Sequence, residues 1–258
     1  MRTLMKTLLT SIAIGGLFVI ATQAATVVPV IAYGHNNRNN FGGNILDIYN
    51  GSGMNGFDWT GGSPNDGNPP PGWPTGYGEV TTWTQTSGQY RDEWQADQLL
   101  DNTTSINGKV GWVILDLGSS YALDDMYLWN GRQLGTNALD EFNLYYSNGS
   151  PVIPGTQGPT GGTDADDYDF GVAAWTQVNN SGLLTLADNN NATPQGIYEM
   201  SGITARYVAI EMMSRHNGNT DPNSGRIGFA EVGFTLIPEP SSLAFLGLSG
   251  LLFIRRRR

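Results

Sequence analysis

The stretch Gly111–Arg132 (GWVILDLGSSYALDDMYLWNGR) constrains the fold of this chain more than any other. Its first part, Trp112–Leu117, is apolar except at Asp116, rich in β-branched residues and too short for a lone helix, so it predicts a strand buried on both faces. Residues 118–120 (GSS) have turn chemistry, and Met126–Trp129 predicts a second strand of the same kind. Because a strand pair this apolar is unstable alone in water, further strands must cover it.

The rest of the chain supplies such strands. The 35 glycines and 13 prolines favour short strands joined by many turns over helices. Trp94–Leu100 predicts a short helical turn, whereas the Pro-, Gly- and Asp-rich residues 65–76 and 151–171 predict loops inserted within a β domain. The remaining strand-like segments are Thr26–Ile31, Phe142–Tyr146, Trp175–Val178, Tyr207–Met212 and Phe229–Phe234.

Four short motifs occur in a recognisable order. They are DLG at Asp116–Gly118, W-T-x-V at Trp175–Val178, A-R-Y-V at Ala205–Val208 and A-E at Ala230–Glu231. In this order they resemble the discoidin family, the coagulation factor five/eight type C domain of the galactose-binding-like class. The resemblance implies an all-β, jelly-roll β-sandwich over residues 25–236. Its members mostly bind sugars or lipid head groups.

Charge and cysteine content exclude several functions. The chain has no cysteine, which excludes disulfides, thiolate metal sites and a cysteine nucleophile. Six of the 13 basic residues lie in the two terminal segments, as does one of the 23 acidic residues, so the body carries seven basic and 22 acidic residues, a net charge of about −15. Such a body repels phosphate backbones, which excludes nucleic acid as a partner, but it tolerates divalent cations and neutral sugars.

The N-terminal segment predicts export. Residues 1–24 combine Arg2 and Lys6, an apolar core at Leu8–Ile20 and a small-residue exit, the pattern of a secretory signal peptide with a helical core. The alternative is an uncleaved membrane anchor. Export of a chain without cysteine fits a bacterium better than an animal extracellular domain.

The C-terminal segment, residues 237–258, carries a second targeting pattern. Pro238, Glu239 and Pro240 precede the apolar stretch Ser241–Ile254 and a basic end. This resembles the PEP-CTERM sorting signal of Gram-negative bacteria. The resemblance implies cleavage by an exosortase-type membrane protease and release or attachment at the cell surface or extracellular matrix, often in species that make exopolysaccharide. The alternative is a simple C-terminal anchor.

The apolar stretch is short for a transmembrane helix. Its 14 residues span about 21 Å as a helix, against a hydrocarbon core of about 30 Å. Local bilayer thinning lets it cross the inner membrane transiently. The basic end then stays cytoplasmic, and the body lies outside. This end consists of Arg255, Arg256, Arg257 and Arg258.

Catalysis has little support in the sequence. The two histidines, His35 and His216, lie in Asn- and Gly-rich segments away from any nucleophile motif. The adjacent acids Asp140 and Glu141 point to opposite faces if they lie on a strand, which favours solvated surface charge over a glycosidase pair. We therefore predict a protein without enzymatic activity. A structural matrix or adhesion protein and, less favoured, a glycan hydrolase remain as alternatives.

Two loops predict a ligand site. Discoidin domains bind with loops at one end of the sandwich, which pair an aromatic platform with planar hydrogen-bond donors. Such groups suit a neutral saccharide, so the resemblance implies a binder of extracellular or surface polysaccharide. The alternative places Trp129 in the core and Arg132 in solvent. The candidate residues are Trp129, Asn130 and Arg132 from one loop and Arg215, His216 and Asn217 from the other.

The resemblance also implies one structural Ca²⁺ near an early loop, with an acid from the last strand. The corresponding positions are Asp47, Asn50 and Glu231, and Asp101 is a rival for one of them. Oxygen-only ligands suit a hard cation such as Ca²⁺. Asn50 occupies a position where the family has an acid, which lowers the charge of the site.

Overall fold

The computed structural model describes residues 25–29, 31–35, 45–49, 54–55, 79–85, 94–96, 108–130, 137–152, 168–172, 174–179, 182–187, 192–216 and 226–237. All of them belong to one unit, Ala24–Ile237. The helices predicted for residues 1–24 and 241–254 lie outside this part of the chain. Within it, no helix has both the length and the apolar composition that a membrane crossing requires.

The described residues form strands and two short 3₁₀ helices, which confirms the all-β prediction. The 3₁₀ helices are η1 (Ile45–Ile48) and η2 (Val80–Thr82). The strands are β1 (Thr26–Val27), β2 (Ile31–His35), β3 (Met54–Asn55), β4 (Thr84–Gln85), β5 (Trp94–Ala96), β6 (Gly111–Trp129), β7 (Glu141–Ser147), β8 (Thr176–Gln177), β9 (Leu184–Thr185), β10 (Gly196–Met212), β11 (Ile227–Phe229) and β12 (Glu231–Leu236).

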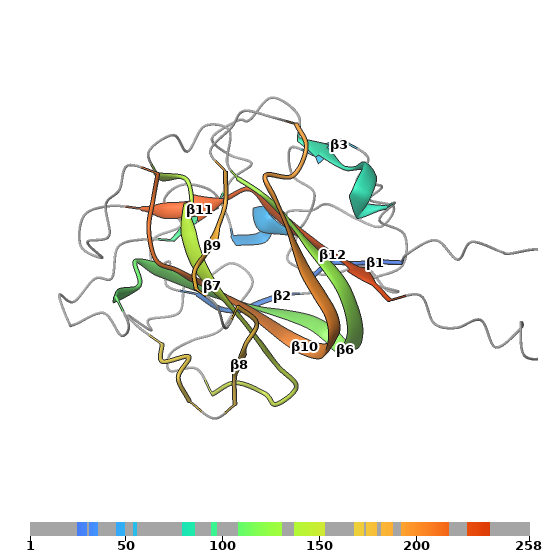
Figure 1. Cartoon of the computed structure of the whole chain (residues 1–258), viewed down its shortest axis with the longest axis vertical. Helices are drawn as coiled ribbons and strands as arrows, with labels where there is room; N and C mark the ends of the chain where they lie inside the picture. Colours follow the sequence, from blue (N-terminus) through green and yellow to red (C-terminus); the bar gives the residue numbers. More distant parts are fainter. Residues whose placement is uncertain are drawn as a thin grey trace, which may run out of the picture. The chain divides into compact units, whose positions relative to one another are not determined.

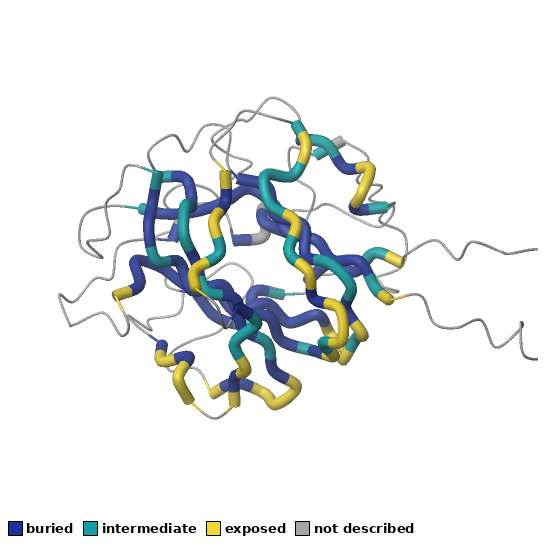
Figure 2. The backbone as a smooth tube through the Cα atoms, in the orientation of Figure 1, coloured by how far each residue is buried: buried dark blue, intermediate teal, exposed yellow. Residues whose placement is uncertain are grey.

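Two long strands, β6 and β10, organise the fold. They pair antiparallel over almost their whole length, and Figure 1 shows them bending together. The sequence predicts a turn at residues 118–120 between two strands. That prediction is wrong, because β6 continues through these residues. Gly118 (φ 81°) and Gly202 (φ 85°) lie in the left-handed region that glycine tolerates, so both strands bend without ending. Figure 2 shows exposed residues at this bend.

The bend divides the strands between two antiparallel layers. In the first layer, β2 and β10 flank the first half of β6, and β7 follows β10, with β8 and β9 beyond it. In the second layer, β12 and the first half of β10 flank the second half of β6, and β1 lies outside β12. Both layers therefore share two strands, as in a jelly-roll sandwich.

The main core lies between the layers, where alternating side chains of β6, β7, β10 and β12 meet. Phe142 and Leu144 of β7 point into it, as the alternation predicts. Tyr145 points to the opposite face, where Tyr168 and Phe170 cover it in a second cluster. The end of the stretch predicted as a loop insertion, residues 151–171, thus contributes buried aromatic residues to the domain.

Beneath this second cluster lies a buried ion pair. Lys109 Nζ lies 3.1 Å from Glu211 Oε1, and neither side chain has exposed surface. The other carboxylate oxygen accepts hydrogen bonds from Asn143 Nδ2 (2.9 Å) and the Tyr145 hydroxyl (2.8 Å). Burial and this hydrogen bond raise the pKa of Tyr145. Lys109 Nζ also lies 5.4 Å from the ring centroid of Phe170, so the aromatic cover contacts the charge directly.

A third cluster covers the outer face of the second layer. Val80 and Trp83, from the segment around η2, pack on Tyr127 and Trp129 of β6. They approach β12 so closely that a Cβ on Gly233 would lie 2.7 Å from Val80 Cγ2. Glycine at this position is therefore a packing requirement of the cover.

The helical turn predicted for Trp94–Leu100 is wrong in its first part. Trp94–Ala96 forms β5, which pairs antiparallel with β11, while residues 97–100 lie outside the described part. Its partner strand lies far away in the sequence, since Ala96 is opposite Ile227. Local propensity could not reveal this pairing.

The two ends of the domain lie side by side. Thr26 of β1 is opposite Thr235 of β12, and Leu236 N donates to Ala25 O at 2.9 Å. Ile237 N donates to Ala122 O at 3.0 Å, near the bend of β6. The chain therefore enters and leaves the sandwich at one place.

Candidate functional site

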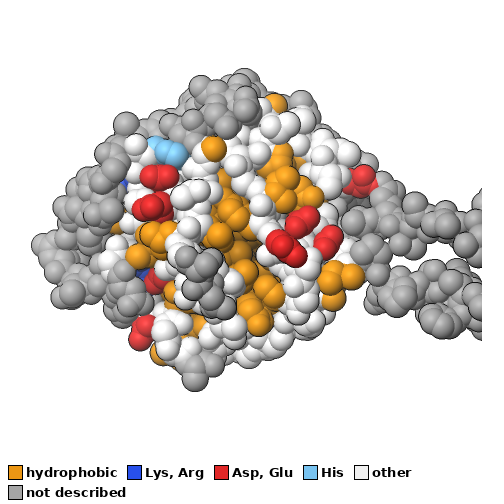
Figure 3. Space-filling view, viewed as in Figure 1, with side chains coloured by type: hydrophobic (Ala, Val, Ile, Leu, Met, Phe, Trp, Pro, Cys, Tyr) orange, Lys and Arg blue, Asp and Glu red, His pale blue; other side chains and the backbone are white. Residues whose placement is uncertain are grey.

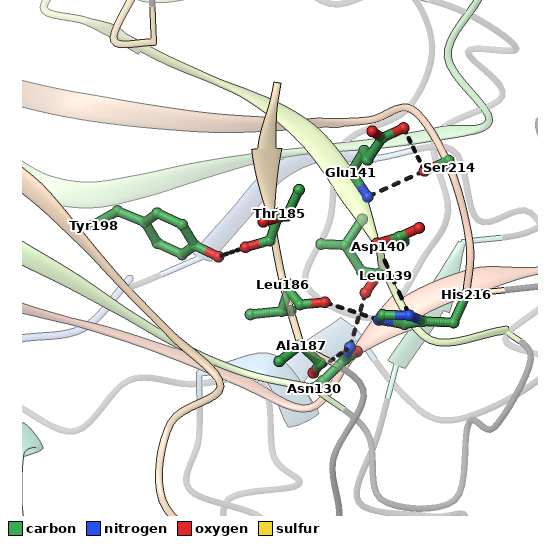
Figure 4. Close-up of polar contacts among 10 residues, drawn as sticks. All are labelled: Asn130, Leu139, Asp140, Glu141, Thr185, Leu186, Ala187, Tyr198, Ser214 and His216. Carbon is green, nitrogen blue, oxygen red and sulfur yellow. Dashed lines mark hydrogen bonds and ion pairs between the residues drawn. The ribbon is translucent and has the colours of Figure 1, made fainter. Parts of the chain in front are cut away.

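Four segments from three parts of the sequence meet at the end of the sandwich away from the bend. They follow β6, precede β7, follow β9 and follow β10, and Figure 4 shows their polar contacts. Asn130 and His216, two of the predicted ligand residues, both lie here. The structure therefore brings the two predicted loops together at one end.

Asn130 joins three of these segments. Its side chain is almost fully buried, and Nδ2 donates to Leu139 O (2.8 Å) and to Ala187 O (3.4 Å). Its backbone N–H donates to Gln195 Oε1 at 2.6 Å. These contacts hold the three segments together, and they provide hydrogen-bond partners for buried backbone carbonyls.

His216 is partly exposed and also fixed. Its backbone N–H donates to Ala138 O (3.2 Å), and ring Nε2 lies 2.8 Å from Leu186 O. A carbonyl oxygen only accepts, so Nε2 carries a proton and donates. Ring Nδ1 lies 3.9 Å from Asp140 Oδ1, and the two side chains are 20% and 34% exposed. Part of the imidazole and part of the neighbouring Asp140 carboxylate are therefore accessible at the surface.

Glu141 and Ser214 form a second polar pair beside this one. Glu141 N donates to Ser214 Oγ (3.2 Å), and Ser214 Oγ donates to Glu141 Oε2 (3.0 Å). Within the described part of this end, Ser214 donates to Glu141 and His216 donates to Leu186. Neither side chain therefore makes the serine–histidine hydrogen bond that activates a nucleophile.

Tyr198 lies at the inner edge of the site. Its hydroxyl donates to Thr185 O at 2.7 Å, and its ring packs edge-on against Phe142. Burial raises the pKa of Tyr198. This contact links β10 to β9, and no local pattern around Tyr198 predicts it because both partners depend on the tertiary fold.

Trp129 and Arg215 lie inside the domain. Trp129 has no exposed surface and lies between Trp83 and Tyr127, with ring centroids 5.9 and 6.4 Å away. The buried Arg215 Nη1 donates to Arg226 O at 3.2 Å. Strand β6 runs on through Trp129, so its ring faces the cover of the second layer. The structure gives both residues structural contacts, and their part in ligand binding stays a prediction.

The other predicted site residues are placed only in part. Arg132, Asn217 and Asn50, the side chain of Asp47 and the whole sorting signal lie outside the described residues. Glu231 is fully buried at the start of β12, opposite Trp129. Among the described residues, no group of three histidine, aspartate or glutamate side chains that could hold a metal ion comes together.

Asp140 and Ser214 join the site although the sequence does not single them out as ligand residues. Asp140 is predicted as solvated charge, and its exposure agrees with that, but the pairing with His216 adds a role. The only sequence signal is position, because Asp140 directly precedes β7 and Ser214 follows β10 closely.

Comparisons with known proteins give similarity at the level of solved structures. No protein-family model and no curated protein matches the chain. A factor five/eight type C domain from Bacteroides fragilis aligns with 13% identity and a TM-score of 0.36, over 57% of this chain and 74% of that one. A family 32 carbohydrate-binding module from C. perfringens, solved in complex with galactose, aligns with 13% identity and a TM-score of 0.32, over 55% and 91%.

A third similar structure is a chitosan-binding module of a chitosanase/glucanase from Paenibacillus. It aligns with 17% identity and a TM-score of 0.31, over 55% of this chain and 74% of the module. With TM-scores this low, the fold assignment rests on the strand order and the shared strands β6 and β10 described above.

Proposed function

We propose that this protein is an exported, envelope-associated bacterial protein that binds extracellular or surface polysaccharide without catalysis. The observation that carries the binding proposal is the fixed polar end of the sandwich. There His216 meets Asp140 and Glu141, which come from a distant part of the sequence. Hydrogen bonds fix the His216 ring and the Glu141 carboxylate, and Asp140 Oδ1 lies 3.9 Å from the ring. Side chains fixed before binding lose little conformational entropy when a ligand arrives.

The chemistry of this end suits a neutral saccharide. Sugar hydroxyls both donate and accept hydrogen bonds, and the carboxylates of Asp140 and Glu141 accept from hydroxyl donors. Two carboxylates close together disfavour an acidic polysaccharide, as does the charge of about −15 on the body.

A glycan array followed by isothermal titration calorimetry tests the binding proposal. Asp140→Asn keeps the shape of the side chain and removes its charge, and His216→Ala removes the imidazole. We expect each to weaken saccharide binding by at least about tenfold. Asp124→Asn, with the same change on the far part of β6, should bind like the unaltered protein.

Three results would contradict this proposal. They are an array without any bound glycan, unaltered affinity in both site variants, and release of reducing ends from a labelled polysaccharide. Because His216→Ala also loses the hydrogen bond to Leu186, melting temperatures accompany the titrations. Asp140→Asn then decides the outcome if His216→Ala is unfolded.

Export and processing are supported by the sequence of the two ends. Removing Arg255–Arg258 leaves the signal peptide intact, so export should continue. Each arginine costs about 3 kcal/mol at the membrane centre, so four together hold the short helix across the bilayer. Without them we expect a secreted chain whose C-terminal segment is uncleaved by the exosortase-type protease. Mass spectrometry showing normal cleavage near Pro238–Pro240 would contradict the mechanism.

The structural Ca²⁺ at Asp47, Asn50 and Glu231 is a separate proposal. It is supported by the oxygen-only ligand set and by the buried carboxylate of Glu231. Thermal unfolding with Ca²⁺ and with a chelator tests it, and an unchanged melting temperature would reject it.

A further inference from the structure

The first half of β10 forms an edge of the second layer. Residues 196–205 pair with β6 on one side, whereas pairing with β7 begins only at Tyr207. In the described part of the chain, no strand pairs with the other side of residues 196–205. Alternate residues of a strand with one neighbour direct their N–H and C=O groups away from that neighbour. β10 therefore presents main-chain donors and acceptors along this edge.

One outward face of this edge carries an exposed apolar side chain. Ile197 is 56% exposed, and Glu199 and Ser201 are exposed on the same face because side chains alternate along a strand. Figure 3 shows acidic side chains gathered beside hydrophobic ones on the face in view. Protected edges usually lack an exposed large apolar residue, so Ile197 distinguishes this edge.

Three carboxylates surround the same stretch. Glu199 is opposite Asp125 in the sheet, and Asp124 Oδ1 accepts a hydrogen bond from Ser201 Oγ at 3.1 Å. Burial, with the charges of Asp124 and Glu199, raises the pKa of Asp125. Elsewhere in the described residues, the carboxylates of Glu211 and Asp116 each pair with a lysine or an arginine, and Asp140 lies 3.9 Å from the His216 ring. A cation near Glu199 would relieve the repulsion among the three.

The regular part of the edge is short. The register between β10 and β6 shifts between Glu199 and Ile203, where Gly202 adopts φ 85°. Further along, the Thr204 carbonyl accepts a hydrogen bond from Asn148 Nδ2 at 2.7 Å. Pairing is therefore possible mainly over residues 196–200, which suits a segment of about five residues.

We propose that the Gly196–Met200 edge of β10 binds a short, extended, basic peptide segment of a partner protein by strand addition. Main-chain hydrogen bonds to the edge supply affinity, an apolar side chain of the segment contacts Ile197, and lysine or arginine side chains contact Glu199 and Asp125. A second copy of this chain is a poor occupant, because it would place the same carboxylates next to each other and bring together two bodies of about −15.

Fluorescence anisotropy on the full chain tests the proposal. The probe is a fluorescein-labelled seven-residue peptide, Thr-Val-Thr-Lys-Thr-Lys-Thr, which presents valine and lysine on one face of a strand. The comparison peptide replaces lysine with glutamate. We expect the basic peptide to bind and the acidic one not to bind. Glu199→Lys should weaken binding at least about tenfold. Asp169→Lys, the same charge reversal on an exposed residue of the 168–172 segment, should have little effect.

N-methylated peptides separate strand addition from simple charge attraction. Methylation of alternate residues blocks the N–H groups on one edge of the peptide, so one of two complementary methylated series should lose binding and the other should keep it. Hydrogen exchange should show new protection at residues 196–200 when the parent peptide is bound. Equal binding of both series, or protection elsewhere only, would overturn the proposal. So would protection of residues 196–200 in a dimer of the chain without peptide, detected by sedimentation.

Discussion

The buried ion pair between Lys109 and Glu211 allows a quantitative test of the fold. In Lys109→Met the apolar stem is kept and the ammonium group is removed, so packing changes little. The Glu211 carboxylate then stays buried with two neutral donors, Asn143 and Tyr145, in place of three partners. Removal of one partner of a buried pair costs about 3–5 kcal/mol, because the remaining charge is neither solvated nor paired.

That loss is large compared with the whole stability of a domain, which is about 5–15 kcal/mol. Urea unfolding followed by tryptophan fluorescence at pH 7 measures it, because several tryptophans are buried. The double variant Lys109→Met/Glu211→Gln removes both charges and keeps an acceptor for Asn143 and Tyr145. We expect the double variant to be more stable than Lys109→Met alone, a sign of coupling in the double-mutant cycle.

A matched pair serves as the control. Arg206 Nη2 lies 2.9 Å from Asp116 Oδ2, but the arginine side chain is 41% exposed. The Asp116 side chain is 6% exposed and keeps the hydrogen bond from Gly118 N, so Arg206→Met should cost less than Lys109→Met, about 1–2 kcal/mol. If Lys109→Met costs less than about 1 kcal/mol, or if both lysine and arginine variants lose the same amount, the argument from burial is refuted.

Three further predictions concern single residues. Gly233→Ala places a Cβ 2.7 Å from Val80 Cγ2 and should cost about 1–3 kcal/mol in urea unfolding, whereas Gly149→Ala, whose Cβ meets only ordinary contacts, should be nearly neutral. Trp129→Ala should lower the free energy of unfolding by about 3–5 kcal/mol through cavity formation, and an unchanged value would contradict its place in the core. Burial raises the pKa of Tyr198 above its usual 10.0, so the unfolded chain loses this proton first and the free energy of unfolding should fall as the pH rises above 10. Tyr198→Phe should reduce that slope by up to about 1.4 kcal/mol per pH unit. Urea unfolding measured between pH 9 and 11 tests this.

The strands were predictable where a signal is local. The apolar run Trp112–Leu117 and the alternation around Phe142–Tyr146 each report burial through their own sequence, and both are strands in the structure. The continuity of β6 was not predictable, because Gly118 can either end a strand or bend it. Whether Gly118 ends or bends the strand is decided by the partners of β6, which are β10 on one side and β2 and β12 on the other.

The candidate site depends more on distant contacts. The polar residues Asn130 and His216 were predictable as members of two loops at one end, since strands that pair also end together. The burial of Trp129 depends on Trp83, 46 positions earlier by number, in a segment without clear periodicity. The Lys109–Glu211 pair joins residues 102 positions apart, so neither charge looks unusual in its own surroundings.

The two ends of the domain lie at the opposite end of β12 from the candidate site. Ala25 and Leu236 are hydrogen-bonded near the bend, and β12 runs from there to Glu231, opposite Trp129, one residue before Asn130. Five strand residues cover about 17 Å. A tether at either terminus therefore pulls on the end of the sandwich opposite the site.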